Sequence, residues 1–373
     1  GQYNIAVGSA ALATATTADN NVAVGRNALL SSTTGADNVA IGSTALDENT
    51  TGSANTAVGS TALNSNTTAS NNTAVGYGSQ ANNTTGTDNV SVGSHSLDAN
   101  TTGTDNTAIG DNALGATTTG SNNTAVGSSA LYTNTTTSDN TAVGFQSLYT
   151  LNGGTNNAAL GHNALFNATT GDNNVAIGKS AMENDTSGSN NVAVGYQALD
   201  ANTTADNNTA VGRSALGANT TGAYNIAMGN YALDANTTAN ANIGIGYSAL
   251  GANTTGTLNV AIGHESLDAC TTGQNNTAVG TYSLGAVTTG NNNVGMGYAA
   301  IGAVTTESGN TAFGHQALED NTADNNTAVG LNAAANNTTG AANAVFGRNA
   351  LDANTTGGYN NAFGYDCLTE CTT

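Results

Sequence analysis

The sequence predicts an all-β protein, a parallel β-solenoid (β-roll) of about 22 coils with a 17-residue repeat. Glycine recurs every 17 residues from Gly8 to Gly314, and the step resumes at Gly330 after the loss of one residue. Apolar residues keep fixed places within each repeat. No stretch free of Gly and Asn is long enough to nucleate a helix. A short fixed period means that each repeat is one coil, stable only against its neighbours.

The first element of the repeat is a strand. We number the repeat so that position 1 is the invariant Asn before the Thr/Val-Ala-Val/Ile-Gly run and position 5 is the invariant Gly. Position 4 is always large and apolar, position 3 is mostly Ala, and position 2 is mostly β-branched, which suits a strand surface. Positions 2 and 4 share one face of that strand. We expect this face to line the core, so that Val126→Asp is severe and Ser128→Asp is nearly silent.

The rest of the repeat predicts a second apolar segment and a polar turn. Position 9 is Leu in nearly every repeat, and Gly at position 5 permits the bend that precedes it. Asn-Thr-Thr-Gly at positions 12 to 15 is typical of a turn. We therefore expect two or three short strands in each coil. Coils stacked about 4.8 Å apart would form a rod of roughly 105 Å.

The two invariant positions have structural roles. Identical amides at position 1, stacked along the axis, can bond one another and satisfy turn carbonyls, which predicts an Asn ladder. Glycine at position 5 accompanies it as the bend residue. The first five members of the two columns are Asn4, Asn21, Asn38, Asn55 and Asn72, and Gly8, Gly25, Gly42, Gly59 and Gly76.

The repeat fills residues 1–373 with no linker or change of composition, which predicts one continuous repeat domain. Neither end resembles a polar cap, and Thr373 would be followed in phase by Gly1 of another copy. We expect either a segment of a longer fibre or subunits that stack head to tail. One chain per solenoid and three chains sharing an axis both remain open.

The charge and composition exclude several classes of function. The formal net charge is −20 with only 4 Lys and Arg residues, so nucleic acid and anionic membrane surfaces are not expected partners. No run reaches the length of a membrane span. The 3 cysteines form no disulfide framework, although Cys367 and Cys371 could pair or cross-link outward. No nucleophile, base and acid recur at matched spacing, so no enzyme and no cofactor are expected.

Position 6, just after the invariant Gly, is the candidate contact stripe, because all four cations and many aromatic rings fall there. Three interpretations remain open: a solvated column, a lateral contact to a partner subunit, and a carbohydrate-binding surface. The stripe also contains His162, His264 and His315. Its principal members are Arg26, Tyr77, Lys179, Tyr196, Arg213, Tyr247, Tyr298 and Arg348.

The turns suggest three further hypotheses. Acidic residues at positions 10, 11, 16 and 17 keep the protein soluble, and calcium, the one metal considered, would need a denser cluster of oxygen ligands. Adjacent threonines in the turn suggest ice binding, although each face would present only one Thr column. N-glycosylation acceptor triplets occur at position 12, and they begin at Asn49, Asn66, Asn100, Asn202, Asn219, Asn236, Asn253 and Asn354.

Three runs of the repeat resemble the Ser-Val-Ala-Ile-Gly signature in the heads of trimeric autotransporter adhesins (YadA-like). They are Asn38-Val39-Ala40-Ile41-Gly42, Asn174-Val175-Ala176-Ile177-Gly178 and Asn259-Val260-Ala261-Ile262-Gly263. Similar repeats form the shafts of phage tail fibres and parts of large bacterial surface proteins. The resemblance implies a left-handed parallel β-roll that is trimeric, extracellular and adhesive.

These features predict a non-catalytic structural protein of an extracellular fibre, a cell surface or a virion tail fibre. Self-association, head to tail or as a homotrimer, is its expected interaction, with a cell-surface glycan as a further candidate partner. Nucleic-acid binding and membrane insertion are not expected. The alternative is an ice-binding or carbohydrate-binding β-solenoid.

Overall fold

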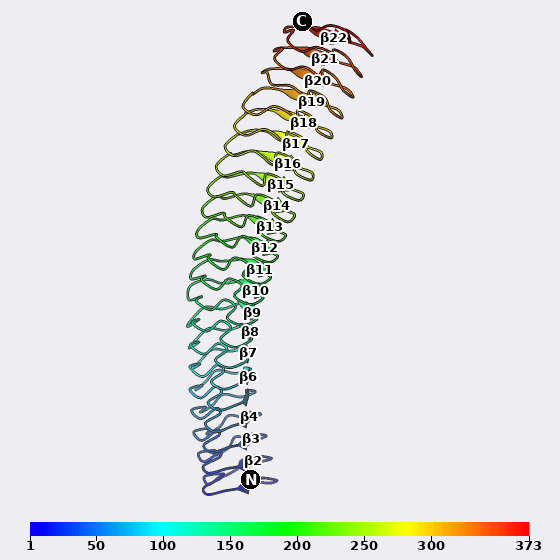
Figure 1. Ribbon diagram of the computed structural model, residues 1–373. Coiled ribbons are helices and arrows are strands. Elements are labelled where there is room, and N and C mark those ends of the chain that lie inside the picture. Colours follow the sequence, from blue (N-terminus) through cyan, green and yellow to red (C-terminus); the bar gives the residue numbers. More distant parts are fainter. Residues whose placement is uncertain (373) are drawn as a thin grey trace. The chain divides into compact units, whose positions relative to one another are not determined.

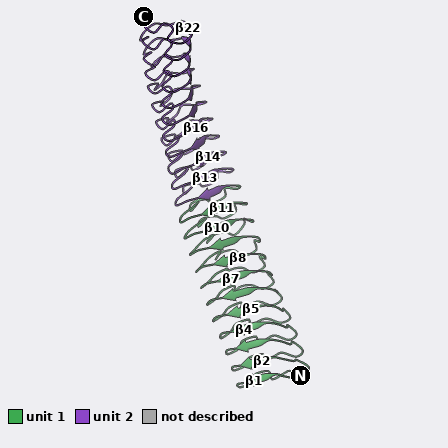
Figure 2. Cartoon of the chain, turned by 90° about the vertical axis from the view of Figure 1, so that its right-hand side faces the viewer, with its two compact units in different colours: residues 1–190 green, residues 191–373 purple. Residues whose placement is uncertain are grey.

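The computed structural model describes residues 1–372, and short parallel strands are the only regular elements in that range. The chain divides into two units, residues 1–190 and 191–373 (Figure 2). Each unit is a stack of coils with one strand per repeat, so the predicted all-β parallel solenoid is confirmed (Figure 1). A single continuous domain stays a prediction. Across residues 1–372 no helix is long and apolar enough to cross a membrane.

The strands of each unit are three residues long and occupy positions 2 to 4 of successive repeats. In unit 1 they are β1 (Ile5–Val7), β2 (Val22–Val24), β3 (Val39–Ile41), β4 (Thr56–Val58), β5 (Thr73–Val75), β6 (Val90–Val92), β7 (Thr107–Ile109), β8 (Thr124–Val126), β9 (Thr141–Val143), β10 (Ala158–Leu160) and β11 (Val175–Ile177). In unit 2 they are β12 (Val192–Val194), β13 (Thr209–Val211), β14 (Ile226–Met228), β15 (Ile243–Ile245), β16 (Val260–Ile262), β17 (Thr277–Val279), β18 (Val294–Met296), β19 (Thr311–Phe313), β20 (Thr327–Val329), β21 (Ala344–Phe346) and β22 (Asn361–Phe363).

Neighbouring strands within a unit pair in parallel and in register, so that each position of the repeat becomes a column along the stack. Ala23 of β2, for example, lies opposite Ala40 of β3. The pairing continues outside the strands, since the Leu29 N–H donates to the Ala45 carbonyl at 3.0 Å. Each coil thus bonds to the next along much of its path, and coils lie about 4.8 Å apart.

The expectation of two or three strands per coil is wrong, because each coil has one. The remainder of the coil contains residues in the left-handed region at positions 7, 9 and 17, which interrupt an extended chain. In the second repeat these are Asn27, Leu29 and Asp37, with φ of 58°, 51° and 60°. Asn and Asp tolerate this conformation, whereas Leu in it costs about 1 kcal/mol or more. Burial of the leucine side chain offsets that cost.

The core lies on the opposite face of the strand from the one that the sequence analysis assigned. Alanines at positions 3 and 8 and the leucine at position 9 are fully buried, as Ala23, Ala28 and Leu29 show. Side chains at positions 2 and 4 point outward, and Ile41 at position 4 is 40% exposed. The coil is thin, so its interior accepts a small Ala from the strand and one Leu from the opposite side. The burial assigned to Val126 is therefore wrong, and its neighbour Ala125 is the buried residue.

Two physical constraints explain why position 5 is always glycine. Gly25 has a φ of 141°, which side chains rarely adopt, and a Cβ there would lie 2.3 Å from the Gly42 carbonyl oxygen of the next coil. The clashing atom belongs to the backbone of the next coil, which cannot move aside as a flexible side chain can. Position 5 therefore accepts only glycine.

The single lost residue falls in the turn and leaves the core intact. β19 and β20 pair with Phe313 opposite Val329, a step of 16 residues. The Asn321 amide donates to the Ala323 carbonyl two residues ahead, whereas Asn66 donates to Ala69, three ahead. The missing residue is thus the exposed threonine of position 14.

Candidate functional site

The position 1 asparagines form a buried amide ladder. Asn21 donates to the Asn4 side-chain oxygen through its backbone N–H at 2.9 Å and through Nδ2 at 3.3 Å. Its Nδ2 also donates to the Gly35 carbonyl of its own coil at 2.9 Å. Asn38 repeats all three bonds toward Asn21 and Gly52. Because the amides satisfy main-chain groups that water does not reach, this column stabilises the stack.

A second amide ladder lies at position 12, in the turn. Asn66 donates to the Asn49 side-chain oxygen at 2.9 Å and to the Ala69 carbonyl at 3.0 Å. The sequence analysis treated these asparagines as glycosylation acceptors, and that hypothesis is wrong at all eight positions because each side chain is fully buried in the described chain. The eight residues are Asn49, Asn66, Asn100, Asn202, Asn219, Asn236, Asn253 and Asn354.

Threonines at position 13 add a third polar column. The Thr33 hydroxyl donates to the Thr50 carbonyl at 3.0 Å, and Thr50 donates in the same way to Thr67 at 2.9 Å. The following threonine, at position 14, is exposed, as at Thr51. The turn therefore presents one exposed Thr column rather than a broad paired array.

In unit 1 the contact stripe has separate local contacts, among them Phe145 stacked on His162 with ring centroids 5.3 Å apart. Arg26 is exposed and donates to the Ser43 hydroxyl of the next coil at 3.3 Å. Tyr77 meets the ring of His95 edge-on, with centroids 5.1 Å apart. Lys179 is exposed on the last coil of the unit. This part of the stripe is a surface column with isolated pairs.

In unit 2 the stripe takes part in a continuous series of ring and guanidinium contacts from Tyr196 to His315. Arg213 lies over the rings of Tyr196 and Tyr231, at 5.9 Å and 5.4 Å from their centroids. Tyr247 stacks on His264 at 5.2 Å. Arg guanidinium groups over tyrosine faces are attractive by about 0.5–1 kcal/mol at exposed sites.

The position 7 tyrosines close the gaps in this series, and the sequence analysis missed them. Tyr231 contacts Tyr247 at 5.9 Å, and Tyr282 lies between His264 at 5.7 Å and Tyr298 at 6.0 Å. Tyr298 then stacks on His315 at 5.1 Å, and Arg348 lies separately over Tyr365 at 5.8 Å. The sequence shows Tyr at position 6 in every third coil from Tyr196 to Tyr298. Tyr231 and Tyr282 are at position 7, so a search of the position 6 column alone does not find them.

A second aromatic column at position 10 of unit 1 was also missed. Tyr132 stacks on Tyr149 at 5.5 Å, and Tyr149 stacks on Phe166 at 5.2 Å. Their 17-residue spacing was the available signal. Three consecutive rings stabilise this part of the stack by about 0.5–1.5 kcal/mol per pair.

Acidic side chains at position 10 are partly buried. Burial raises the pKa of the Asp47, Asp98, Asp234 and Asp268 carboxyls above the usual value. No group of three His, Cys, Asp or Glu side chains within residues 1–372 is arranged to hold a metal ion.

The cysteines form no disulfide in the described part of the chain. Cys270 is buried at position 12, where it replaces an asparagine of the second ladder. Its thiol donates to the Gly273 carbonyl at 3.6 Å, and burial raises the pKa of Cys270 to about 11.

The outer face of the strands presents an apolar column. Position 4 is apolar in every repeat and is half-buried or exposed, with Leu160 49% exposed and Ile109 40% exposed. The column lies beside the contact stripe in sequence, separated only by the invariant glycine. No model of a known protein family matches the chain, and no curated protein sequence matches it significantly.

Proposed function

We propose that this protein is a non-catalytic structural subunit of an extracellular fibre or filament, at a cell surface or in a virion tail fibre, and that it associates with copies of itself. The buried amides and the position 13 hydroxyls bond one coil to the next, which is the chemistry of a stacked scaffold. Regular coils of this kind suit a spacing or display role.

The outward apolar column is the observation that carries this proposal. Large apolar side chains at position 4 form a continuous surface in each unit, and such surfaces are typical of protein–protein contacts. The column repeats with the coil, so two copies placed side by side offer each other the same apolar surface. A homotrimer, as the resemblance to adhesin heads implies, would bring these columns together around one axis.

Removal of apolar surface from the column tests self-association. The variant has three substitutions in unit 1, Ile41→Thr, Ile109→Thr and Ile177→Thr, which keep a β-branched residue in the strand. Each should cost about 1 kcal/mol of intermolecular burial. We expect sedimentation to show a lower assembled fraction, electron microscopy to show fewer fibres, and circular dichroism to remain unchanged.

The matched control is Leu258→Asn, which removes an exposed apolar side chain at position 17, where Asn is common. Its assembly should equal that of the unmodified protein. The proposal fails if the unmodified protein stays monomeric at micromolar concentration, or if the triple variant assembles as well as the control.

Ice binding is the rival function, and the exposed threonines of position 14, such as Thr51, support it. A thermal-hysteresis assay separates the two. A freezing-point depression that survives the triple substitution would favour the rival, and its absence together with fibres favours the structural role.

A further inference from the structure

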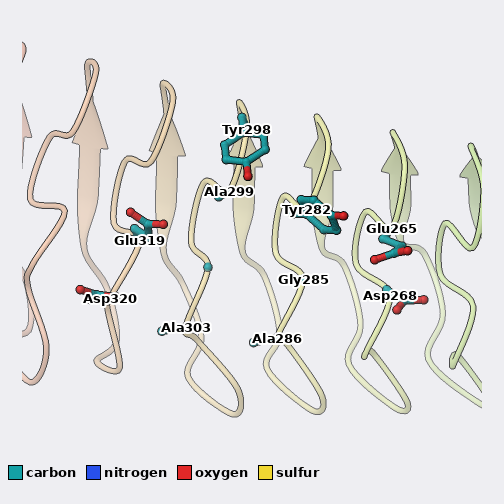
Figure 3. Close-up of a pocket in the computed structure, with 11 residues that line it drawn as sticks. Glu265, Asp268, Tyr282, Gly285, Ala286, Tyr298, Ala299, Ala303, Glu319 and Asp320 are labelled. Atoms are coloured by element: carbon teal, nitrogen blue, oxygen red, sulfur yellow. The ribbon is translucent and has the colours of Figure 1, made fainter.

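A row of three hollows runs beside the contact stripe of unit 2. Their volumes are about 510, 440 and 240 Å³. The first two are lined by tyrosines of positions 6 and 7, Tyr298 and Tyr282 in one and Tyr247 and Tyr231 in the other. Figure 3 shows the largest of the three hollows. Tyr282 and Tyr298 lie on its two central coils, and carboxylate side chains lie on the coils at either side.

The hollows lie at glycines of position 10. Gly217 and Gly251 each line one of the two smaller hollows, and Gly285 and Gly302, in consecutive coils, line the largest; Asp234 and Asp268 occupy position 10 in the coils between them. The missing side chains leave the hollows, and each aspartate borders two of them.

The aspartates depend on these glycines for their position. A Cβ added at Gly217 would lie 2.9 Å from Asp234 Oδ1, and one added at Gly251 would lie 2.9 Å from Asp268 Oδ1. The carboxylates therefore extend over the glycines. Asp234 and Asp268 lie two coils apart, about 10 Å along the stack.

The groove is rich in carboxylates and has one cation at its end, Arg213, which lies over Tyr231 of the second hollow. No further Lys or Arg occurs before Arg348 in the sequence. His264 Nε2 lies 3.7 Å from Glu265 Oε1, and Glu265 is one of the carboxylates that line the largest hollow. At its other end the largest hollow is bordered by Glu319 and Asp320 (Figure 3). Carboxylates beside tyrosine rings are complementary to ammonium groups, through both ion pairing and cation–π attraction.

We propose that this groove binds an extended amino-sugar polymer, a β-1,4-linked glucosamine chain lying along the stack. Its ammonium groups meet Asp234 and Asp268, and its sugar rings fill the hollows beside the tyrosines. The two-residue repeat of such a polymer is comparable with the two-coil spacing of Asp234 and Asp268. An extended peptide strand returns to the same face every two residues, after only about 6.8 Å. The inference rests on the proposed display role and names a ligand for it.

Calorimetric titration of the full chain with a glucosamine hexasaccharide, at about pH 6 and low salt, tests the inference. We expect binding that weakens as salt is raised. Asp234→Asn combined with Asp268→Asn should weaken it about tenfold. Tyr282→Ser should weaken it severalfold, and serine already occupies this left-handed position at Ser248. Circular dichroism verifies that each variant is folded.

The control is Asp88→Asn combined with Asp105→Asn, which removes the same charge from exposed turns at position 17 of unit 1. It should leave the affinity within about twofold of the original. Equal weakening by the control pair would overturn the proposal, because binding would then follow net charge alone. An N-acetylated hexasaccharide that binds as tightly would also overturn it.

Hexalysine is the probe for the competing occupant. If it binds as tightly as the sugar and with the same dependence on Asp234 and Asp268, the partner is a cationic peptide and the proposal fails. The assembly assay is independent of these titrations, since its three substitutions lie on the strand face of unit 1. Failure of sugar binding and failure of self-association are therefore distinguishable.

Discussion

Substitution of one ladder asparagine by aspartate tests the buried amide network with a nearly isosteric change. Asn276 is fully buried, and its Nδ2 donates to the Gly290 carbonyl at 2.8 Å and to the Asn259 side-chain oxygen at 3.2 Å. Its own side-chain oxygen accepts the Asn293 N–H at 3.0 Å. Asn276→Asp keeps the acceptor and removes the donor, so a carboxylate oxygen would face two acceptors.

The expected cost follows from burial and from these two oxygens. Both oppose ionisation, so the pKa of the new carboxyl rises by about 2–3 units in the folded protein. At about 1.4 kcal/mol per unit, the ionised form costs about 3–4 kcal/mol of stability. A protonated carboxyl can donate to the Gly290 carbonyl and restore part of the network.

The pH dependence has a definite sign. Because the folded pKa lies above the unfolded value of about 3.9, the folded state binds the proton more tightly. The penalty is therefore small below about pH 4, grows as the pH rises toward the folded pKa, and is complete above it. Acid should partly rescue the variant.

The assay is thermal unfolding followed by circular dichroism, with each variant compared with the unmodified protein from about pH 3 to pH 8. The matched control is Asn275→Asp, an exposed neighbour at position 17, where aspartate is native in other coils. It should change the midpoint little at any pH. The account of the ladder is refuted if the two variants are equally stable at neutral pH, or if their difference does not shrink in acid.

Three further predictions concern the coil and its thiols. Ala125→Asp should cost several kcal/mol because it buries a carboxylate, whereas Val126→Asp, one residue on, should cost about 1 kcal/mol or less; equal thermal midpoints would contradict the assigned faces. Gly127→Ala should lower the midpoint markedly, since its Cβ would lie 2.4 Å from the next coil's backbone oxygen at a φ of 139°, and Ser128→Ala should not. Cys270 should resist a thiol reagent at about pH 8, where its thiol is protonated, and react only on unfolding; rapid labelling in the folded protein would show that it is accessible.

Much of the fold follows from periodicity, but the direction of the strand does not. Side chains of a three-residue strand point alternately to its two faces, and either face can be the buried one. The core can therefore receive either Val at position 4 or Ala at position 3. Hydrophobicity favours the valine, whereas the thin coil selects the alanine because the opposite side already supplies Leu29 and its equivalents. The positive φ of the leucines at position 9 could not be predicted either, because leucine does not favour that backbone conformation.

The candidate site shows the same division. The position 1 ladder could be predicted because an asparagine that recurs at the start of every strand must stack on its own copies along the axis. The position 12 ladder could not, because Asn-Thr-Thr suggests an exposed turn, although Asn66 and its equivalents are buried beneath it. The ring series of unit 2 depends on contacts between positions 6 and 7, which only the three-dimensional arrangement of Tyr231 and Tyr282 reveals.

X-ray diffraction from an oriented preparation of the protein tests the stacked-coil account most directly. Strands that pair in parallel from coil to coil predict a strong reflection at about 4.8 Å along the fibre axis. A reflection near 5.4 Å along the axis, as in α-helical fibres, would contradict the account. A 4.8 Å reflection perpendicular to the axis would contradict it as well.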